Sequence, residues 1–178
     1  MGMICKRGVN TVKEANVRKN IRLKGYDYSS VGYYFITICV KDKHETLWTN
    51  PVGAAFGRPS FTTPTPLSEI GALINSEIQK IEDVYESVRI DKYVIMPNHI
   101  HMIIVLTETT GEDGRPQAAP TISRIINQFK GSVTKRLGFS IWQKLFHDRV
   151  IRDEAEYHAK WQYIEDNPVR WADDEYYT

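Results

Sequence analysis

The sequence has few cysteines, no long apolar run and almost no net charge. Its two cysteines, Cys5 and Cys39, are too few for a disulfide framework or a four-cysteine metal site. No stretch reaches the roughly 18 consecutive apolar residues that a membrane-spanning helix needs. Residues 1–10 also lack the apolar segment of a signal peptide. We therefore expect a cytoplasmic protein with no membrane contact.

The net charge of +1 hides an uneven distribution of charge along the chain. Residues 6–24 contain seven basic side chains and one acidic side chain, which give this segment +6 and leave −5 for the rest. A basic segment suits binding to a polyanion such as nucleic acid, because Lys and Arg release counterions from phosphates. A solvated tail would have the same charge. We predict a basic arm over residues 1–24, with candidate DNA contacts at Arg18, Lys19, Arg22 and Lys24.

Apolar patterning predicts four strands and three helices. Aromatic and β-branched runs indicate strands, and apolar residues three and four apart indicate amphipathic helices. Two segments rich in Gly and Pro, 50–66 and 107–120, are predicted to be loops. The expected strands are 33–40, 88–96, 99–106 and 146–151, and the expected helices are 67–85, 122–137 and 154–165.

The order strand, helix, strand, strand, helix, strand is that of a ferredoxin-like split β-α-β arrangement. The sequence therefore predicts an α+β fold, in which an antiparallel sheet has helices packed on one side and one extra helix follows at the C-terminus. We expect residues 25–178 to form a single domain.

Two histidines on the predicted strand 99–106 are candidate metal ligands. Residues two apart on a strand point to the same side of the sheet, so His99 and His101 present two imidazoles to one point. Such a pair leaves room for a third ligand, water and a substrate phosphate, as a catalytic divalent metal site requires. The alternative is a pair of hydrogen-bonded histidines without a metal. The apolar character of the strand favours the metal site, because an unpaired buried imidazole is costly.

The last predicted helix carries a candidate nucleophile. Tyr163 and Asn167 are four residues apart, so a helix places the phenol and the amide on one face. A tyrosine with an ordinary pKa near 10 is a weak nucleophile and needs an activated phosphate to attack. The alternative is that the Tyr163 ring packs in the core while Asn167 caps the helix before Pro168.

Three motifs together resemble the HUH single-tyrosine transposases, in particular the REP-associated tyrosine transposase branch. They are His99-Ile100-His101 after Met96-Pro97-Asn98, the segment Trp142-Gln143 to Arg152, and Tyr163-Ile164-x-x-Asn167-Pro168. The resemblance runs from about Arg18 to Trp171. It implies that His99, His101 and Asn167 bind a divalent metal, Mg or Mn. It also implies that Tyr163 attacks a DNA phosphate and forms a 5′-phosphotyrosine link.

The implied activity is metal-dependent cleavage and rejoining of single-stranded or hairpin DNA. Family members include monomers and dimers, so the resemblance leaves a homodimer open. Trp142, Phe146 and Trp161 are candidates for stacking on bases, although a core position is the favoured interpretation of each taken alone. Further candidate phosphate contacts are Lys130, Lys135, Arg136, Lys144, Arg149 and Arg152.

Two other functions use similar residues. A replication-initiator or relaxase-type nickase also combines a His-x-His motif with a tyrosine, but the short chain has no helicase portion. A DNA- or RNA-hairpin-binding regulator that keeps the fold without cleavage is the alternative from a different functional class. It predicts tight hairpin binding without metal-dependent nicking.

Overall fold

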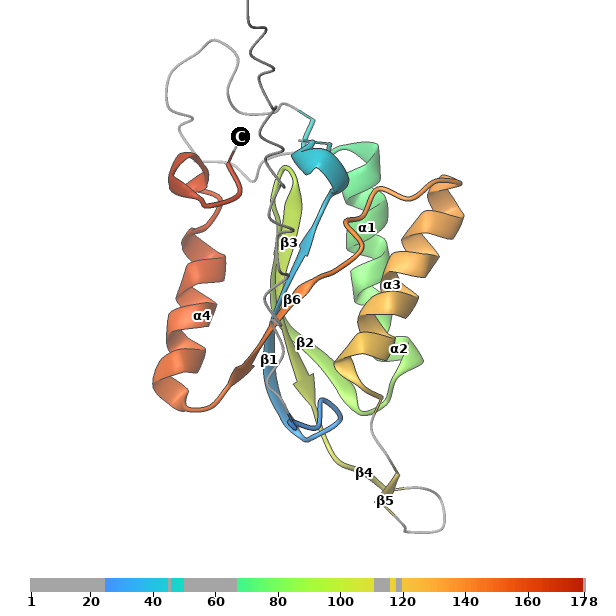
Figure 1. Ribbon diagram of the computed structural model, residues 1–178, viewed down its shortest axis with the longest axis vertical. Coiled ribbons are helices and arrows are strands. Elements are labelled where there is room, and N and C mark those ends of the chain that lie inside the picture. Colours follow the sequence, from blue (N-terminus) through green and yellow to red (C-terminus); the bar gives the residue numbers. More distant parts are fainter. Residues whose placement is uncertain (1–24, 45, 50–66, 111–115, 118–119, 178) are drawn as a thin grey trace, which may run out of the picture.

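A computed structural model describes residues 25–44, 46–49, 67–110, 116–117 and 120–177 (Figure 1). The predicted arm 1–24 and the predicted loop 50–66 lie outside these described residues. Within the described residues, no helix combines the length and apolar composition that a membrane crossing requires.

Four antiparallel strands form the main sheet. Their order is β2, β3, β1, β6, and each neighbouring pair is antiparallel. β3 therefore lies between β1 and β2, which run in the same direction, as the split β-α-β arrangement predicts. The bounds are β1 (Gly32–Cys39), β2 (Val88–Ile95), β3 (His99–Leu106) and β6 (His147–Ile151).

Helices cover both faces of this sheet. Figure 1 shows α1 (Glu69–Gln79), α2 (Ile81–Val84) and α3 (Ile122–Leu137) on one face and α4 (Glu154–Asp166) on the other. The α+β prediction is confirmed, and the extra C-terminal helix is the one that covers the second face. The single helix predicted over 67–85 is divided into α1 and α2 at Lys80.

Side-chain caps explain where three of the helices begin. The side chains of Ser68, Thr121 and Asp153 accept hydrogen bonds from main-chain N–H groups in the first turns of α1, α3 and α4. α3 ends at Gly138, whose φ of 81° is a left-handed conformation that glycine adopts without a steric penalty. Each of the three side-chain caps satisfies a main-chain N–H group of the first turn, where the helix itself offers no acceptor.

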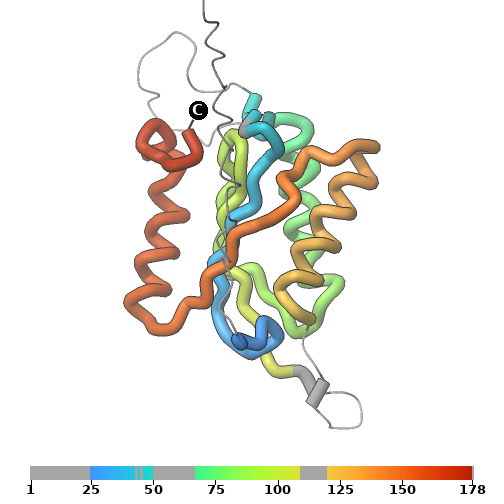
Figure 2. The backbone as a smooth tube through the Cα atoms, viewed as in Figure 1, coloured from blue at the N-terminus to red at the C-terminus, as the bar shows by residue number. Residues whose placement is uncertain are grey.

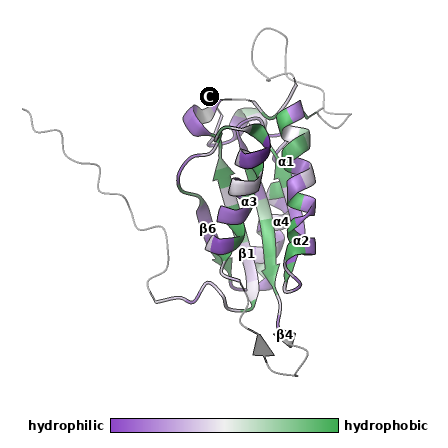
Figure 3. Cartoon of the chain, turned by 90° about the vertical axis from the view of Figure 1, so that its right-hand side faces the viewer, coloured by the Kyte–Doolittle hydropathy of each residue, from purple (hydrophilic) through white to green (hydrophobic). Residues whose placement is uncertain are grey.

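The two faces of the sheet differ in chemistry because side chains alternate along each strand. The face under α1 and α3 is apolar. The β1 side chains that point to this face are Tyr34, Ile36 and Ile38. Both helices also carry hydrophilic residues, and in the sheet β6 is largely hydrophilic (Figure 3). The face under α4 has a smaller apolar cluster that includes Phe35 and Ile164. Polar side chains of β1 and β3 lie beside that smaller cluster.

Short elements lie outside the main sheet and its helices, among them a 3-10 turn at Lys41–Lys43. β4 (Thr109–Thr110) and β5 (Pro116–Gln117) pair within the segment predicted to be the second loop. After α4 the chain turns back toward the end of the sheet where β2 and β3 are joined (Figure 2). This return includes a 3-10 turn at Trp171–Asp173, and Trp171 packs with Trp48 and Met96.

Candidate active site

The two histidines of β3 face α4. His99 and His101 are 0% and 1% exposed, and their Nε2 atoms lie 2.9 Å apart. Ile100 between them points to the opposite face, into the main core. The structure thus places the two imidazoles together, as the strand spacing predicts.

Neighbouring polar groups determine how both rings are turned. The Asn98 side-chain nitrogen donates to the Tyr176 carbonyl at 2.9 Å, which turns its Oδ1 toward His99 Nδ1, 2.9 Å away. Because an amide oxygen only accepts, neutral His99 carries its proton on Nδ1 and keeps a lone pair on Nε2. Thr37 Oγ1 lies 2.8 Å from His101 Nδ1. Because each Nδ1 atom contacts a neighbouring polar group, the two Nε2 atoms point toward each other.

Burial keeps the two imidazoles neutral. Loss of solvation lowers the pKa of His99 to about 3. Burial also lowers the pKa of His101 well below its ordinary value, and the neighbouring His99 adds to this shift. Metal coordination requires a neutral imidazole, so both rings are in the protonation state of a ligand at neutral pH.

Tyr163 approaches the histidine pair from α4. Its hydroxyl lies 3.4 Å from His101 Nε2 and donates to Asp174 Oδ2 at 3.1 Å. The Phe35 ring meets the Tyr163 ring edge-on, with 6.0 Å between centroids. With 36% of its surface exposed, Tyr163 can be reached by a substrate. Burial, followed by the Asp174 charge, raises the pKa of Tyr163, so its hydroxyl is protonated at neutral pH.

Asn167 follows the last residue of α4 and is 3% exposed. Its side-chain nitrogen donates to Asp174 Oδ2 at 2.9 Å, the same oxygen that accepts from Tyr163. The phenol and the amide thus converge, as the four-residue spacing predicts. Within the described structure the buried Asn167 Oδ1 has no hydrogen-bond partner. This oxygen remains free to act as a ligand.

Asp174 is a site residue that the sequence reasoning missed. Ligand atoms of His99, His101 and Asp174 all lie within 4.8 Å of one another, an arrangement that can hold a metal ion. The segment carrying Asp174 lies against the histidines, since the Tyr176 ring is 4.6 Å from the His99 ring. The sequence signal was the acidic run at residues 173–175, which begins two residues after Trp171.

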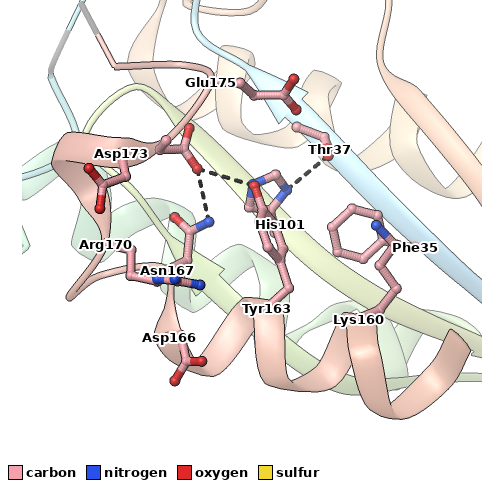
Figure 4. A pocket seen from close by; sticks show the side chains of 11 residues that line it. Phe35, Thr37, His101, Lys160, Tyr163, Asp166, Asn167, Arg170, Asp173 and Glu175 are labelled. Atoms are coloured by element: carbon pink, nitrogen blue, oxygen red, sulfur yellow. Dashed lines mark hydrogen bonds between the residues drawn. The ribbon is translucent and has the colours of Figure 1, made fainter. Parts of the chain in front are cut away.

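His101, together with the groups described on and after α4, lines an open pocket of about 470 Å³ beneath α4. In Figure 4, Lys160 and Phe35 lie on one side of Tyr163, and Asn167 and Arg170 lie on the other. Lys160 and Arg170 supply positive charge to the pocket, and neither was among the predicted site residues. Lys160 is three residues before Tyr163, so helical spacing alone was a signal for it.

The basic residues predicted on α3 lie away from this pocket, because α3 and α4 cover opposite faces of the sheet (Figure 1). Lys135 is exposed on that face. Arg136 forms an ion pair with Glu77 of α1 at 2.7 Å. The structure thus does not bring these two cations to the histidine pair.

Lys130, predicted to be a phosphate contact, is buried and bonded within the protein. It is 9% exposed, and its amine donates to the carbonyl oxygens of Gln143 and Lys144 at 2.6 and 3.3 Å. Lys130 follows Ile126 by four residues and precedes Val133 by three, which places it on the apolar stripe of α3. Its contacts hold the segment before β6 against α3.

Of the other predicted phosphate contacts, Arg149 lies on β6, beside the strand that carries the pocket residue Phe35. It pairs in register with Phe35 and forms an ion pair with Glu156. Lys144 and Arg152 are exposed on the segments that flank β6. The predicted contacts Arg18, Lys19, Arg22 and Lys24 lie outside the described residues.

The three aromatic residues proposed for base stacking are placed differently. Trp142 is 5% exposed and packs with Phe129 in the main core. Phe146 is half-buried against the same core. Trp161 is half-buried and has the Lys92 amine 3.6 Å from its ring centroid. Trp142 therefore has the core position that was its alternative interpretation.

Comparison with known proteins identifies one relative and one related fold. No protein-family model matches the chain. A protein of Haemophilus influenzae, described as an uncharacterized protein, is 33% identical over 90% of this chain and 93% of that protein. The structure of a REP-associated tyrosine transposase bound to a REP hairpin superposes with a TM-score of 0.59 and 22% identity. That match covers 82% of this chain and 72% of the transposase. The chain therefore belongs to one family with the Haemophilus influenzae protein, and it has the fold of a REP-associated tyrosine transposase.

Proposed function

We propose that this protein cleaves and rejoins single-stranded DNA with Tyr163 as the nucleophile and a divalent metal held beside it. The observation that carries the proposal is the 3.4 Å distance between the Tyr163 hydroxyl and His101 Nε2, in an open pocket. A nucleophile and a metal ligand that meet at one point suit phosphoryl transfer. The related fold, solved with a REP hairpin, supports hairpin DNA as the substrate class.

The donor set fits a metal ion. Two ligands that are each about 2.1 Å from an octahedral ion and at a right angle to each other lie about 3 Å apart. The Nε2 atoms of His99 and His101 have this spacing. We propose Asn167 Oδ1 as the third ligand, because it is buried and has no hydrogen-bond partner among the described residues. The amide oxygen suits Mg or Mn, the metals that the resemblance implies, and the bound ion would withdraw charge from the scissile phosphate.

Asp174 is placed to accept the proton of the nucleophile. The raised pKa of Tyr163 keeps the phenol protonated, so attack requires a base within reach. Asp174 Oδ2 lies 3.1 Å from the hydroxyl. In the proposed step the Tyr163 oxygen bonds to phosphorus, its proton passes to Asp174, and the bond from phosphorus to the 3′ oxygen breaks. The 3′ oxygen takes a proton from water.

The products determine the second half of the reaction. The DNA keeps a free 3′ hydroxyl, and Tyr163 carries a 5′-phosphotyrosine link. A 3′ hydroxyl that attacks this link reverses the step and releases Tyr163, so rejoining needs no outside energy source. The same reversal on a different 3′ end transfers the strand, which is the chemistry of a transposase.

Covalent capture of DNA tests this function directly. Wild-type protein and Tyr163→Phe are incubated with labelled hairpin DNAs and Mn²⁺, and denaturing gels are scored for a protein–DNA adduct. The substrates include imperfect palindromes from around the protein's own coding region. We expect an adduct that requires Mn²⁺, disappears with chelator and is absent in Tyr163→Phe.

Tyr157→Phe is the matched control. Tyr157 lies on the same helix, and its hydroxyl donates to Asp91 instead of reaching the histidines. This variant should form the adduct as the wild type does. Hairpin binding with no adduct from any substrate would contradict the cleavage mechanism and favour a binding regulator.

A further inference from the structure

Lys160 is a pocket cation that lacks an ion-pair partner among the described residues. Two other cations near α4 are paired, Lys92 with Glu165 and Arg149 with Glu156. No carboxylate of the described structure lies within salt-bridge distance of the Lys160 amine, which instead sits 4.6 Å from the centroid of the Phe35 ring. A half-buried cation held on an aromatic face is poised for an anionic ligand.

The position of Lys160 relates it to the nucleophile. One helical turn separates it from Tyr163, and its amine is 5.5 Å from the centroid of the Tyr163 ring. It lines the same pocket as Tyr163 and His101. Figure 4 shows Lys160 on the side of Tyr163 away from Asn167, so a group bound over the phenol would lie between the two.

We propose that Lys160 binds a non-bridging oxygen of the DNA phosphate that Tyr163 attacks. This inference rests on the proposed function and adds a catalytic residue to it. During attack, negative charge builds on the non-bridging oxygens, and a fixed ammonium group on the side away from Asn167 stabilises that charge. The Lys160 amine lies over the Phe35 ring, so it is positioned before the substrate arrives.

Lys160→Met tests this role because methionine keeps an apolar side chain against Phe35 and removes the charge. Single-turnover cleavage should slow at least about 100-fold, the usual effect of losing one donor to a developing oxyanion. DNA affinity should change less than about threefold, because many other cations contribute to binding. Lys160→Arg should restore most of the rate, and Lys80→Met, the same change at a half-exposed lysine after α1, should leave it unchanged.

Two results would overturn the role of Lys160. One is Lys160→Met cleaving at the wild-type rate. The other is a rate loss that saturating DNA restores, since that places the lysine in ground-state binding alone. A wild-type protein that forms no adduct would instead contradict the proposed function.

A measurement independent of cleavage uses the Lys160 side-chain NMR signal, assigned with Lys160→Arg. It should shift on addition of tetrathymidylate and stay in place with the uncharged methylphosphonate tetramer. A shift with both tetramers, or with neither, would contradict phosphate binding whether or not the protein cleaves DNA.

Discussion

The Nε2 atoms of His99 and His101 lie 2.9 Å apart in a site where both rings are buried. Asn98 fixes the His99 proton on Nδ1, so the Nε2 lone pair of His99 must face a proton or a cation. In the protein without metal, His101 can supply that proton from its own Nε2, while Thr37 donates to His101 Nδ1. A bound metal ion would replace this proton and use both lone pairs.

Metal binding should separate the roles of Asn167 and Asp174. Asn167→Ala should weaken Mn²⁺ binding at least about tenfold, because even residues that only support metal ligands change affinity by this much. Asp174→Asn should change it less than about threefold, since both Asp174 oxygens already accept hydrogen bonds. Titration calorimetry measures both, with His101→Gln as the control that abolishes binding. A loss in Asp174→Asn alone would make Asp174 the third ligand.

The sequence predicted those parts of the site that depend on local periodicity. His99 and His101 share a side because a strand repeats every two residues, and Tyr163 and Asn167 share a face because a helix repeats every 3.6. Asp174 depends instead on the chain returning after α4, which the packing of Trp171 determines. No periodic pattern encodes that return.

The fold was predictable for a similar reason. Each strand and helix carries its own apolar pattern, and element order restricts the topology to few choices. The face on which α4 packs was not predictable, because it depends on contacts between Phe35, Ile103 and Ile164, which are far apart in the sequence. Lys130 was mispredicted although the sequence held the signal. Its spacing places it on the apolar stripe of α3, but its charge led to the prediction of a phosphate contact.

Glu77 should make stability depend on pH in the acid range. Burial opposes its ionisation, but hydrogen bonds from Lys80, Ser132 and Arg136 outweigh burial and lower the pKa of Glu77 to about 2 from 4.5. A carboxylate with a lowered folded-state pKa stabilises the protein above pH 4.5, and this stability is lost as the pH falls toward 2. The contribution at neutral pH should be roughly 1–3 kcal/mol, since Lys80 and Arg136 are about half exposed and solvent screens them.

Glu77→Gln tests this assignment. Urea unfolding is measured between pH 7 and pH 3 for the variant and the wild type. The stability difference between them should be largest near neutral pH and shrink below pH 4.5. A difference that stays constant over this range would show that Glu77 acts through packing, not through its charge.

Lys130 should contribute to stability and not to DNA binding. Lys130→Met removes a charged donor and leaves the Gln143 and Lys144 carbonyls without the hydrogen bonds that it makes to them. The free energy of unfolding should fall by about 1–3 kcal/mol, the usual effect of breaking a buried hydrogen bond of this kind. Lys135→Met, an exposed change one turn further along α3, should alter it by less than about 0.5 kcal/mol. Urea unfolding gives both values, and fluorescence anisotropy gives hairpin affinity. Unchanged stability with weakened hairpin binding in Lys130→Met would return this lysine to the DNA interface, because an amine committed to two carbonyls cannot also carry a phosphate contact.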